Sequence, residues 1–355
     1  MHIFPDYENS ILNISATLQD YLGTPNDIPK IKTLQDELAR DYQTIILLVI
    51  DALGQRALEK HLPETSFLRT RHIQTLTSVF PSTTTCATTT LLSALYPAQH
   101  GWFAWALNFP ELHRTIELFR NTCYYTGGVL SVDDFANTRL PYQNFFQGQP
   151  LIVRSKETMC NFFTQLNDAC KSRPKFVYAY YSTLDSIMHT HGASSKPARG
   201  LIKRLDKRLE TFIKKHPNTL VILTADHGQV GVADYIEIYK DPDIMACLAQ
   251  NMSMDPRAAA FHIKPDMHDA FRAAFEKYSA DFTLFKTADL IADGVFGPFT
   301  NDEYKLFLGD YIAIGTDTNK ILIFAENHKQ TAYRGHHTGT TPDEMLVPLI
   351  LISSK

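Results

Sequence analysis

The sequence predicts an α/β sandwich built on a largely parallel β-sheet, together with a smaller inserted subdomain. Two observations favour this fold class. Continuous apolar runs that suit fully covered strands alternate with amphipathic helical patterns, and one long segment departs from that rhythm. We therefore expect a core formed by residues 1–239 and 335–355, and an inserted, cap-like subdomain over residues 240–334.

The predicted elements follow one another in the order that this fold class requires. Apolar side chains recur at helical spacing over residues 10–22, and Gly23 ends that helix. The run Ile45–Ile50 is apolar on both alternating faces, which is typical of a strand covered on both sides. The same character recurs in residues 174–182, 218–228 and 344–354. In the last of these segments Pro348 predicts an edge strand, because proline donates no hydrogen bond to a neighbouring strand.

Helical patterns lie between these strands. Residues 156–171 and 197–215 each place apolar side chains on one side. The second helix carries lysines and arginines on its other side, which we interpret as a solvated face rather than a site for an anionic partner. Residues 240–334 contain short strand candidates, and the sequence leaves open whether they shape a pocket or only pack on the surface. Arg257, in that segment, is expected to be an exposed charge or a contact to a substrate anion.

Composition excludes several classes of partner. The 355 residues carry a formal net charge of -4, so there is no electrostatic case for a nucleic acid polymer or an anionic membrane. No apolar run approaches the roughly 20 residues that span a bilayer, and the first residues do not resemble a signal peptide. The five cysteines form no C-x-x-C pair, so we expect free thiols and a cytoplasmic protein. The oligomeric state stays open.

Acids and histidines stand where predicted strands end, which is where ligands gather in open α/β sheets. A helical turn after residues 174–182 would place its acid and histidine, four apart, on one face. Of the pair His336 and His337, a simple site uses only one. Three carboxylates and three imidazoles suit two zinc or manganese ions with three protein ligands each. The candidates are Asp51, Asp185, His189, Asp226, His227 and one of those two histidines.

A threonine-rich segment, "FPSTTTCATTTLLSALYPAQHG" at residues 80–101, opens another predicted helix. A helix N-terminus presents unpaired backbone N–H groups and a positive dipole end to an anion such as phosphate. A hydroxyl placed there can attack phosphorus when a metal lowers its pKa. The alternative is that Ser82 or Thr84 only caps the helix.

Five ordered blocks resemble the alkaline phosphatase superfamily and, within it, the type I phosphodiesterase/nucleotide pyrophosphatase family. They are "LLVIDALG", "VFPSTTTCATTTLLSALYPAQHG", "YYSTLDSIMHTHG", "LTADHG" and "RGHHTGTTPDEMLVPL", and they span residues 45–350. The resemblance implies an alkaline-phosphatase-like three-layer sandwich. It also implies a hydrolase of phosphodiester or pyrophosphate bonds in nucleotide-like small molecules.

The family pattern also assigns roles to individual residues. Its nucleophile lies three residues after one proline and thirteen before another, and both counts select Thr84 from Pro81 and Pro97. Counting eight residues back from Met345 selects His337 as the last ligand. The resemblance implies a covalent phosphothreonine-type intermediate on Thr84 and two divalent ions, zinc or manganese. One ion would be held by Asp51, Asp226 and His227, and the other by Asp185, His189 and His337.

Three positions depart from the family pattern. Thr85 stands where an aromatic residue often follows the nucleophile, and Thr338 replaces the usual glycine after the last histidine. Trp105 occupies the place of an asparagine that donates to the phosphoryl oxygen, and Asn108 is near. We expect Trp105 and Asn108 to contact the substrate. The alternatives are a phosphomonoesterase, a phosphonate hydrolase, or a non-catalytic binding protein stabilised by metal.

Overall fold

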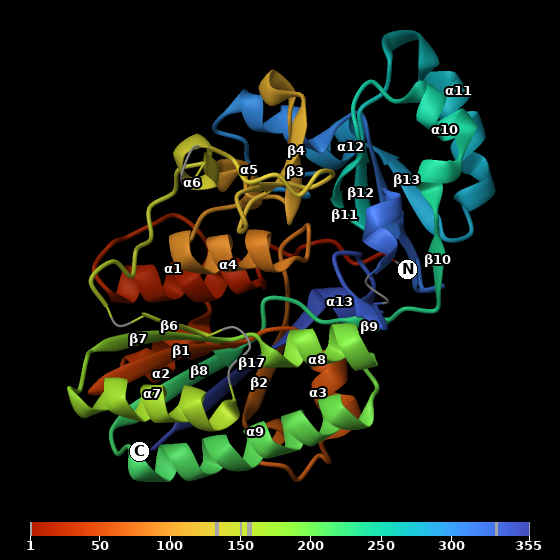
Figure 1. Ribbon diagram of the computed structural model, residues 1–355. Helices are drawn as coiled ribbons and strands as arrows, with labels where there is room; N and C mark the ends of the chain where they lie inside the picture. The colour runs from red at the N-terminus through yellow and green to blue at the C-terminus, as the bar shows by residue number, and fades with distance from the viewer. Residues whose placement is uncertain (1, 132–134, 150, 155–157, 331–332, 355) are drawn as a thin grey trace.

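A six-stranded sheet runs through the centre of a three-layer core (Figure 1). The computed structural model describes residues 2–131, 135–149, 151–154, 158–330 and 333–354. The strand order of this sheet is β2-β17-β8-β1-β7-β6. Neighbours among β8, β1, β7 and β6 are parallel, whereas β17 is antiparallel to both β8 and β2. The bounds are β1 Thr44–Ile50, β2 His72–Thr77, β6 Leu151–Arg154, β7 Phe176–Tyr181, β8 Thr219–Thr224 and β17 Leu346–Ser353.

The predicted α/β class with a largely parallel sheet is therefore confirmed, and one strand position is corrected. Pro348 does not mark an edge strand, because β17 lies between β2 and β8. Pro348 pairs with Thr75 of β2, whereas β17 pairs with β8 only from Ile350 onward, beyond an irregularity in register. The missing N–H therefore falls where β17 has a partner strand on one side only.

Helices cover both faces of this sheet. In Figure 1, α1 and α4 lie above it, and α7 and α9 lie below it. The helices predicted over residues 10–22, 156–171 and 197–215 are present, although residues 156 and 157 lie outside the described residues. The bounds are α1 Ile11–Tyr21, α2 Lys32–Leu38, α3 Gln55–His61, α4 Thr84–Ser93, α7 Met159–Lys171, α8 Thr183–His191, α9 Lys196–Lys215 and α13 Pro342–Met345.

A second, antiparallel sheet lies beside the core, in the order β13-β14-β12-β11-β3-β4-β5. Residues 253–315 supply four of its strands, and residues 106–123, outside the predicted insertion, supply three. The division of the chain into a core and an insertion over residues 240–334 stays a prediction. The bounds are β3 Ala106–Phe109, β4 Arg114–Glu117, β5 Thr122–Cys123, β11 Ser253–Asp255, β12 Ala258–Phe261, β13 Phe282–Lys286 and β14 Tyr311–Gly315.

Smaller elements complete the fold. The short strands β9 and β16 form one pair and β10 and β15 another. The bounds are α5 Pro97–His100, α6 Phe135–Arg139, β9 Val230–Gly231, β10 Asp234–Ile236, α10 Pro242–Cys247, α11 His268–Phe275, α12 Thr287–Ala292, β15 Lys320–Leu322 and β16 Gly335–His336. The five cysteines are free thiols, as expected. Among the described residues, every helix is too short or too polar to cross a bilayer. The cytoplasmic location stays a prediction.

A buried ion pair joins the second sheet to the core. Arg257, next to β12, donates from Nε and Nη2 to the two carboxylate oxygens of Glu344 in α13, at 2.6 and 3.0 Å. Both side chains are fully buried. Glu344 also accepts from the backbone N–H of Gly339, at 2.8 Å. The expectation that Arg257 is exposed or meets a substrate is therefore wrong. Its charge is neutralised inside the protein, where it fixes the loop before α13.

Replacing one partner of this pair is expected to leave the other charged and buried. Arg257→Met should lower the free energy of unfolding by about 3–5 kcal/mol, measured by chemical denaturation. The matched control is Arg272→Met, which removes an exposed ion pair with Asp269 and should cost less than about 1 kcal/mol. Equal losses in the two variants would contradict the structural role of Arg257.

Candidate functional site

The three candidate aspartates meet at one edge of the central sheet. Asp51 follows β1 directly, and Asp226 comes two residues after β8. Asp185 lies in the first turn of α8, the helix that follows β7. Because β1, β7 and β8 are adjacent and parallel, their carboxyl ends face the same side. The backbone N–H of Ala52 donates to Asp226 Oδ1 at 3.2 Å, which ties the ends of β1 and β8 together.

Three imidazoles close the group. His189 Nε2 lies 3.2 Å from Asp185 Oδ1, since the two residues are one helical turn apart in α8. His337 comes directly after β16, and its Nε2 lies 4.0 Å from the same oxygen. His227 Nε2 lies 3.5 Å from Asp51 Oδ1. Two groups therefore have ligand atoms within 4.8 Å of one another: Asp185, His189 and His337, and Asp51, Asp185 and His227.

The ring orientation of these histidines suits metal binding. The Nδ1 atom of each ring faces a backbone carbonyl oxygen, which can only accept a hydrogen bond. We therefore assign the proton to Nδ1, so that the Nε2 lone pair points into the centre. The pairs are His189 with Gly335 at 2.8 Å, His227 with Gly228 at 2.9 Å and His337 with Ser82 at 3.1 Å.

The carboxylates also fit a cation. Asp51 Oδ1 and Asp185 Oδ1 are buried and accept no hydrogen bond from any residue within the described ranges. A buried carboxylate oxygen without a partner is costly unless a metal or a proton neutralises it. The orphaned oxygens and the three inward-facing Nε2 atoms form the mixed oxygen and nitrogen ligand set that zinc and manganese accept.

The pKa values of these aspartates and histidines are shifted by the same crowding of buried charge. Burial, followed by the negative charges of Asp226 and Asp185, raises the pKa of Asp51 well above its ordinary value. Burial opposes ionisation of Asp185, but in the metal-free protein the charge of protonated His189 outweighs it and holds the Asp185 pKa below its ordinary value. Burial and then the neighbouring His227 push the pKa of His337 well down. His337 is therefore neutral, as a metal ligand must be.

The structure separates His336 from His337. His336 Nδ1 accepts a hydrogen bond from the backbone N–H of His337 at 3.0 Å, and His336 belongs to neither ligand group. Burial, with the nearby His189, lowers the pKa of His336 to about 3. The structure therefore brings His337, and not His336, into the cluster.

Thr84 stands beside this cluster at the start of α4. Its Oγ1 lies 3.2 Å from His227 Nε2, so the hydroxyl donates to the ring. Thr83 is the N-cap residue, and the Ser82 hydroxyl donates instead to Gly339 O at 2.9 Å. The alternative that Ser82 or Thr84 only caps the helix is therefore not supported.

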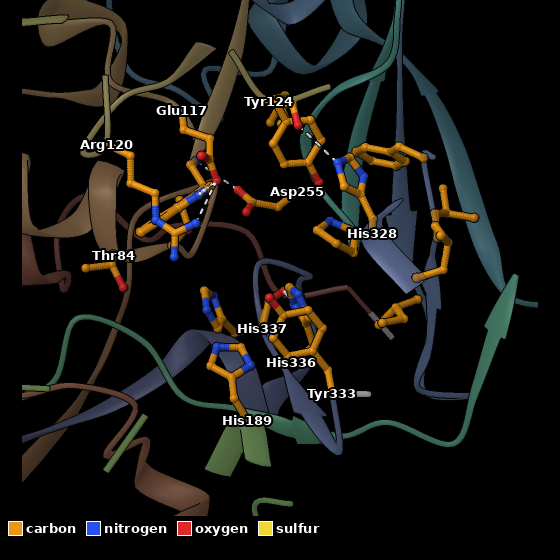
Figure 2. Close-up of a pocket in the computed structure, with 18 of the residues that line it drawn as sticks. Thr84, Glu117, Arg120, Tyr124, His189, Asp255, His328, Tyr333, His336 and His337 are labelled. Carbon is orange, nitrogen blue, oxygen red and sulfur yellow. Dashed lines mark hydrogen bonds and ion pairs between the residues drawn. The ribbon is translucent and has the colours of Figure 1, made fainter. Parts of the chain in front are cut away.

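A cavity of about 550 Å³ opens in front of the cluster, between the core and the second sheet (Figure 2). Its floor includes Thr84, Asp185, His189 and His337, and the second sheet and its loops supply the opposite wall. Side chains lining the cavity from that wall include Trp105, Glu117, Arg120, Tyr124, Asp255 and His328, whereas Tyr333 lies on the side of His189, with ring centres 5.1 Å apart.

The two predicted substrate contacts separate. Trp105 lines this cavity, whereas Asn108 lines another hollow, where its Nδ2 donates to Asn251 O at 3.3 Å. Residues three apart in extended chain point to opposite faces, which explains the separation. Asn108 therefore does not face the candidate site.

Sequence reasoning missed Tyr180 and Asp255. The Tyr180 hydroxyl, on β7, donates to Asp51, and it lies 3.4 Å from Asp226 Oδ2. Asp255 ends β11, faces the cavity and accepts from the backbone N–H of Trp105 at 3.3 Å. Burial raises the pKa of Asp255 to about 6. Tyr180 was hidden in an apolar strand, and no motif pointed to Asp255, whose position depends on the pairing of the second sheet.

Backbone strain also gathers here. Ala52 follows Asp51 with φ of 63°, and Thr338 follows His337 with φ of 93°. A β-branched residue rarely adopts positive φ, so Thr338 keeps a conformation that suits the glycine of the family pattern. Both strained residues directly follow a candidate ligand and so aim its side chain.

Comparisons with known proteins identify the family of the chain. The model of the family described as type I phosphodiesterase / nucleotide pyrophosphatase matches residues 45–158 and 132–320. No curated protein sequence matches the chain. Among solved structures, human ectonucleotide pyrophosphatase / phosphodiesterase 5 is similar, with 17% identity, coverage of 87% of each chain and a TM-score of 0.65.

Two further structures carry ligands in their descriptions. One is an inactive threonine-to-alanine variant of the murine ectonucleotide pyrophosphatase / phosphodiesterase 5 in complex with AMP, with 15% identity, 88% coverage of each chain and a TM-score of 0.64. The other is phosphonoacetate hydrolase from Sinorhizobium meliloti in complex with phosphonoformate, with 15% identity, coverage of 86% of this chain and 89% of that chain, and a TM-score of 0.60. These likenesses establish the fold.

Asp185→Asn is expected to reduce the amount of metal bound per chain, because Asp185 Oδ1 belongs to both ligand groups and an amide is a poorer ligand. Zinc content after dialysis, measured by elemental analysis, tests this. The matched control, Asp255→Asn, lies in the same cavity outside both groups and should bind as much zinc as the unaltered protein. Unchanged zinc content in Asp185→Asn would refute the assignment.

Asp255 should also impart a pH dependence to the stability of the metal-free protein. Its folded pKa is about 6 against an ordinary 3.8, so the folded state holds a proton that the unfolded chain releases between these values. The stabilisation is complete below about pH 4 and lost as pH rises through 6. Relative to Asp255→Asn, the unaltered protein should lose up to about 3 kcal/mol of unfolding free energy between pH 4 and pH 7. Parallel stability curves from denaturation in chelator would exclude this.

Proposed function

The chain belongs to the type I phosphodiesterase / nucleotide pyrophosphatase family, and from that premise we propose that it hydrolyses phosphodiester or pyrophosphate bonds of nucleotide-like small molecules. The observation that carries the proposal is the position of the Thr84 hydroxyl. It lies at a helix N-terminus and 3.2 Å from an imidazole of a buried cluster of carboxylates and histidines. A hydroxyl, an anion-binding helix end and a metal-ligand set are the parts that phosphoryl transfer requires.

Two divalent ions, zinc or alternatively manganese, complete the proposed site. The ion next to Thr84 would be held by Asp51, Asp226 and His227. The second ion would be held by Asp185, His189 and His337. Bound cations supply Lewis acidity, which favours the deprotonated hydroxyl and offsets charge on the phosphoryl oxygens.

Thr84 acts as the nucleophile in this proposal. Its Oγ1 forms a bond to phosphorus as the hydroxyl proton is lost and the bond to the leaving oxygen breaks. A water molecule then cleaves the phosphothreonine and restores the hydroxyl. The first backbone N–H groups of α4 have no acceptor within the helix, so they are free to bind the phosphoryl oxygens. The branched Cβ of Thr84 restricts χ1 and helps to aim Oγ1.

The similar structures support the same chemistry. The murine protein is described as inactive when a threonine is replaced by alanine, and it binds AMP. By analogy, a nucleoside monophosphate unit suits the cavity of this chain. Its volume of about 550 Å³ lies in the usual range for small-molecule sites. Phosphonate hydrolysis is the second candidate, because one of the similar structures is a phosphonoacetate hydrolase.

Removing the proposed nucleophile tests the mechanism. Thr84→Ala should reduce hydrolysis of bis(p-nitrophenyl) phosphate by at least about a thousandfold while zinc content stays unchanged, because only the attacking atom is lost. Initial rates with saturating zinc give the measurement. Near-normal turnover would rule out Thr84 as the nucleophile.

Two comparisons make this test specific. Thr85→Ala is the matched control, since its hydroxyl is adjacent, buried and without a hydrogen-bond partner in the described part of the chain, so turnover should stay within about twofold. Parallel assays with p-nitrophenyl phosphate and phosphonoacetate separate the alternatives. Faster hydrolysis of either than of the diester would replace the proposed substrate class.

A further inference from the structure

Arg120 is a cationic side chain in the catalytic cavity that the proposed mechanism leaves unused. It lies in the turn between β4 and β5. Figure 2 shows it reaching into the cavity from the wall opposite His189 and His337. Among the cavity-lining residues that the structure describes, it alone is an arginine or lysine.

The partners of Arg120 leave most of its donors available. Glu117 is its ion-pair partner, with Nη1 and Oε1 3.4 Å apart. The same Oε1 accepts a shorter bond of 2.9 Å from Trp105 Nε1, and Oε2 accepts from Thr122 at 2.5 Å. The Arg120 side chain is 64% exposed. Exposed pairs of this kind contribute at most about 1 kcal/mol, so Arg120 can turn to a ligand at little cost.

Trp105 fixes the place of the guanidinium. The Arg120 guanidinium carbon lies 5.5 Å from the centre of the Trp105 ring, within cation–π range. The indole is held in turn by its bond to Glu117 and by an edge contact with Phe119, with ring centres 5.9 Å apart. The guanidinium is planar and permanently charged, and it lies against an indole ring that is itself held in place. Such a group suits a phosphate or carboxylate, which it can bind through two hydrogen bonds.

The other charged side chains of the cavity are acids. Glu117, Asp185 and Asp255 line it together with Arg120. An anionic group that extends beyond the proposed cation centre would meet repulsion from Asp255 and Glu117 unless it reaches the guanidinium. Arg120 therefore marks one place on this wall where a second negative charge is favoured.

We propose that Arg120, held on Trp105, binds a second anionic group of the substrate, beyond the phosphorus that Thr84 attacks. This inference rests on the proposed function and narrows its substrate class. Substrates that carry a second phosphate or a carboxylate, such as phosphoanhydrides or carboxylated phosphonates, are preferred over diesters with neutral arms.

The test compares three ligands that share one phosphonate head. Methylphosphonate has no second anionic group, phosphonoacetate adds a carboxylate and methylenediphosphonate adds a second phosphonate. Isothermal titration calorimetry of the zinc-loaded protein gives a Kd for each. The unaltered protein should bind at least one of the two larger ligands about tenfold or more tightly than methylphosphonate. Whichever ligand shows the preference identifies the class of the second group.

Variants assign that preference to Arg120. In Arg120→Met the Kd of methylphosphonate divided by the Kd of the preferred larger ligand should fall to within about twofold of one. Arg120→Lys should keep part of the preference for the larger ligand. The matched control is Arg40→Met, which removes an arginine paired with Glu37 at the same three-residue spacing, away from the cavity, and should keep the full ratio.

The outcomes separate this inference from the proposed function. A preference that persists in Arg120→Met, or is absent from the unaltered protein, overturns the inference. Lack of hydrolysis of bis(p-nitrophenyl) phosphate and of either larger ligand overturns the proposed function. The binding ratios are measured in chains that also carry Thr84→Ala, in which the proposed nucleophile is absent, so turnover does not disturb them and each result stands alone.

Discussion

Buried carboxylates crowd together at the edge of one parallel sheet, and the groups around them offset this concentration of negative charge. Strand adjacency brings Asp51, Asp185 and Asp226 together, although they are spread over residues 51–226 of the chain. Ionised carboxylates at this distance repel one another, and several neighbouring groups offset that repulsion. Tyr180 donates to Asp51, backbone amides donate to Asp226, and His189 faces Asp185. Two of these carboxylate oxygens still lack a hydrogen-bond donor among the residues that the structure describes, and a cation is the simplest group that neutralises them.

In the proposed function, the second sheet contributes to substrate recognition and does not supply metal ligands. The Arg257–Glu344 pair anchors it to the loop that carries His337, so the cation cluster and the facing wall keep a fixed relation. Glu344 accepts hydrogen bonds from the Gly339 backbone and from the Arg257 guanidinium. One buried carboxylate therefore holds both the loop before α13 and the second sheet. The cavity is therefore composite. One wall holds the groups proposed for chemistry, and the other holds Trp105, Arg120 and further aromatic side chains that face the cavity.

Features that depend on where parallel strands end and on local spacing could be predicted from the sequence. Buried parallel strands end where acids begin, so the convergence of Asp51, Asp185 and Asp226 followed from apolar runs alone, and helical spacing joined His189 to Asp185. Features that depend on tertiary partners could not. Arg257 has no local partner in sequence, since Glu344 lies 87 residues away. Asn108 lies on the face of its strand that points away from the cavity. Its spacing from Trp105 indicates this face only once the segment is known to be extended.

In the proposed mechanism, Trp105, which the resemblance aligns with an asparagine of the family, leaves the binding of the phosphoryl group to other donors. Both N–H groups of Trp105 are engaged, the backbone one by Asp255 and the indole one by Glu117, so neither is free to replace the donor that an asparagine offers. The phosphoryl oxygens must then rely on the N-terminus of α4 and on bound cations. What Trp105 provides instead is a rigid surface beneath Arg120. Under this proposal, tryptophan at position 105 offers no donor to the phosphoryl group but supports the Arg120 guanidinium, an arrangement that we propose favours substrates whose charge extends beyond the bond being cleaved.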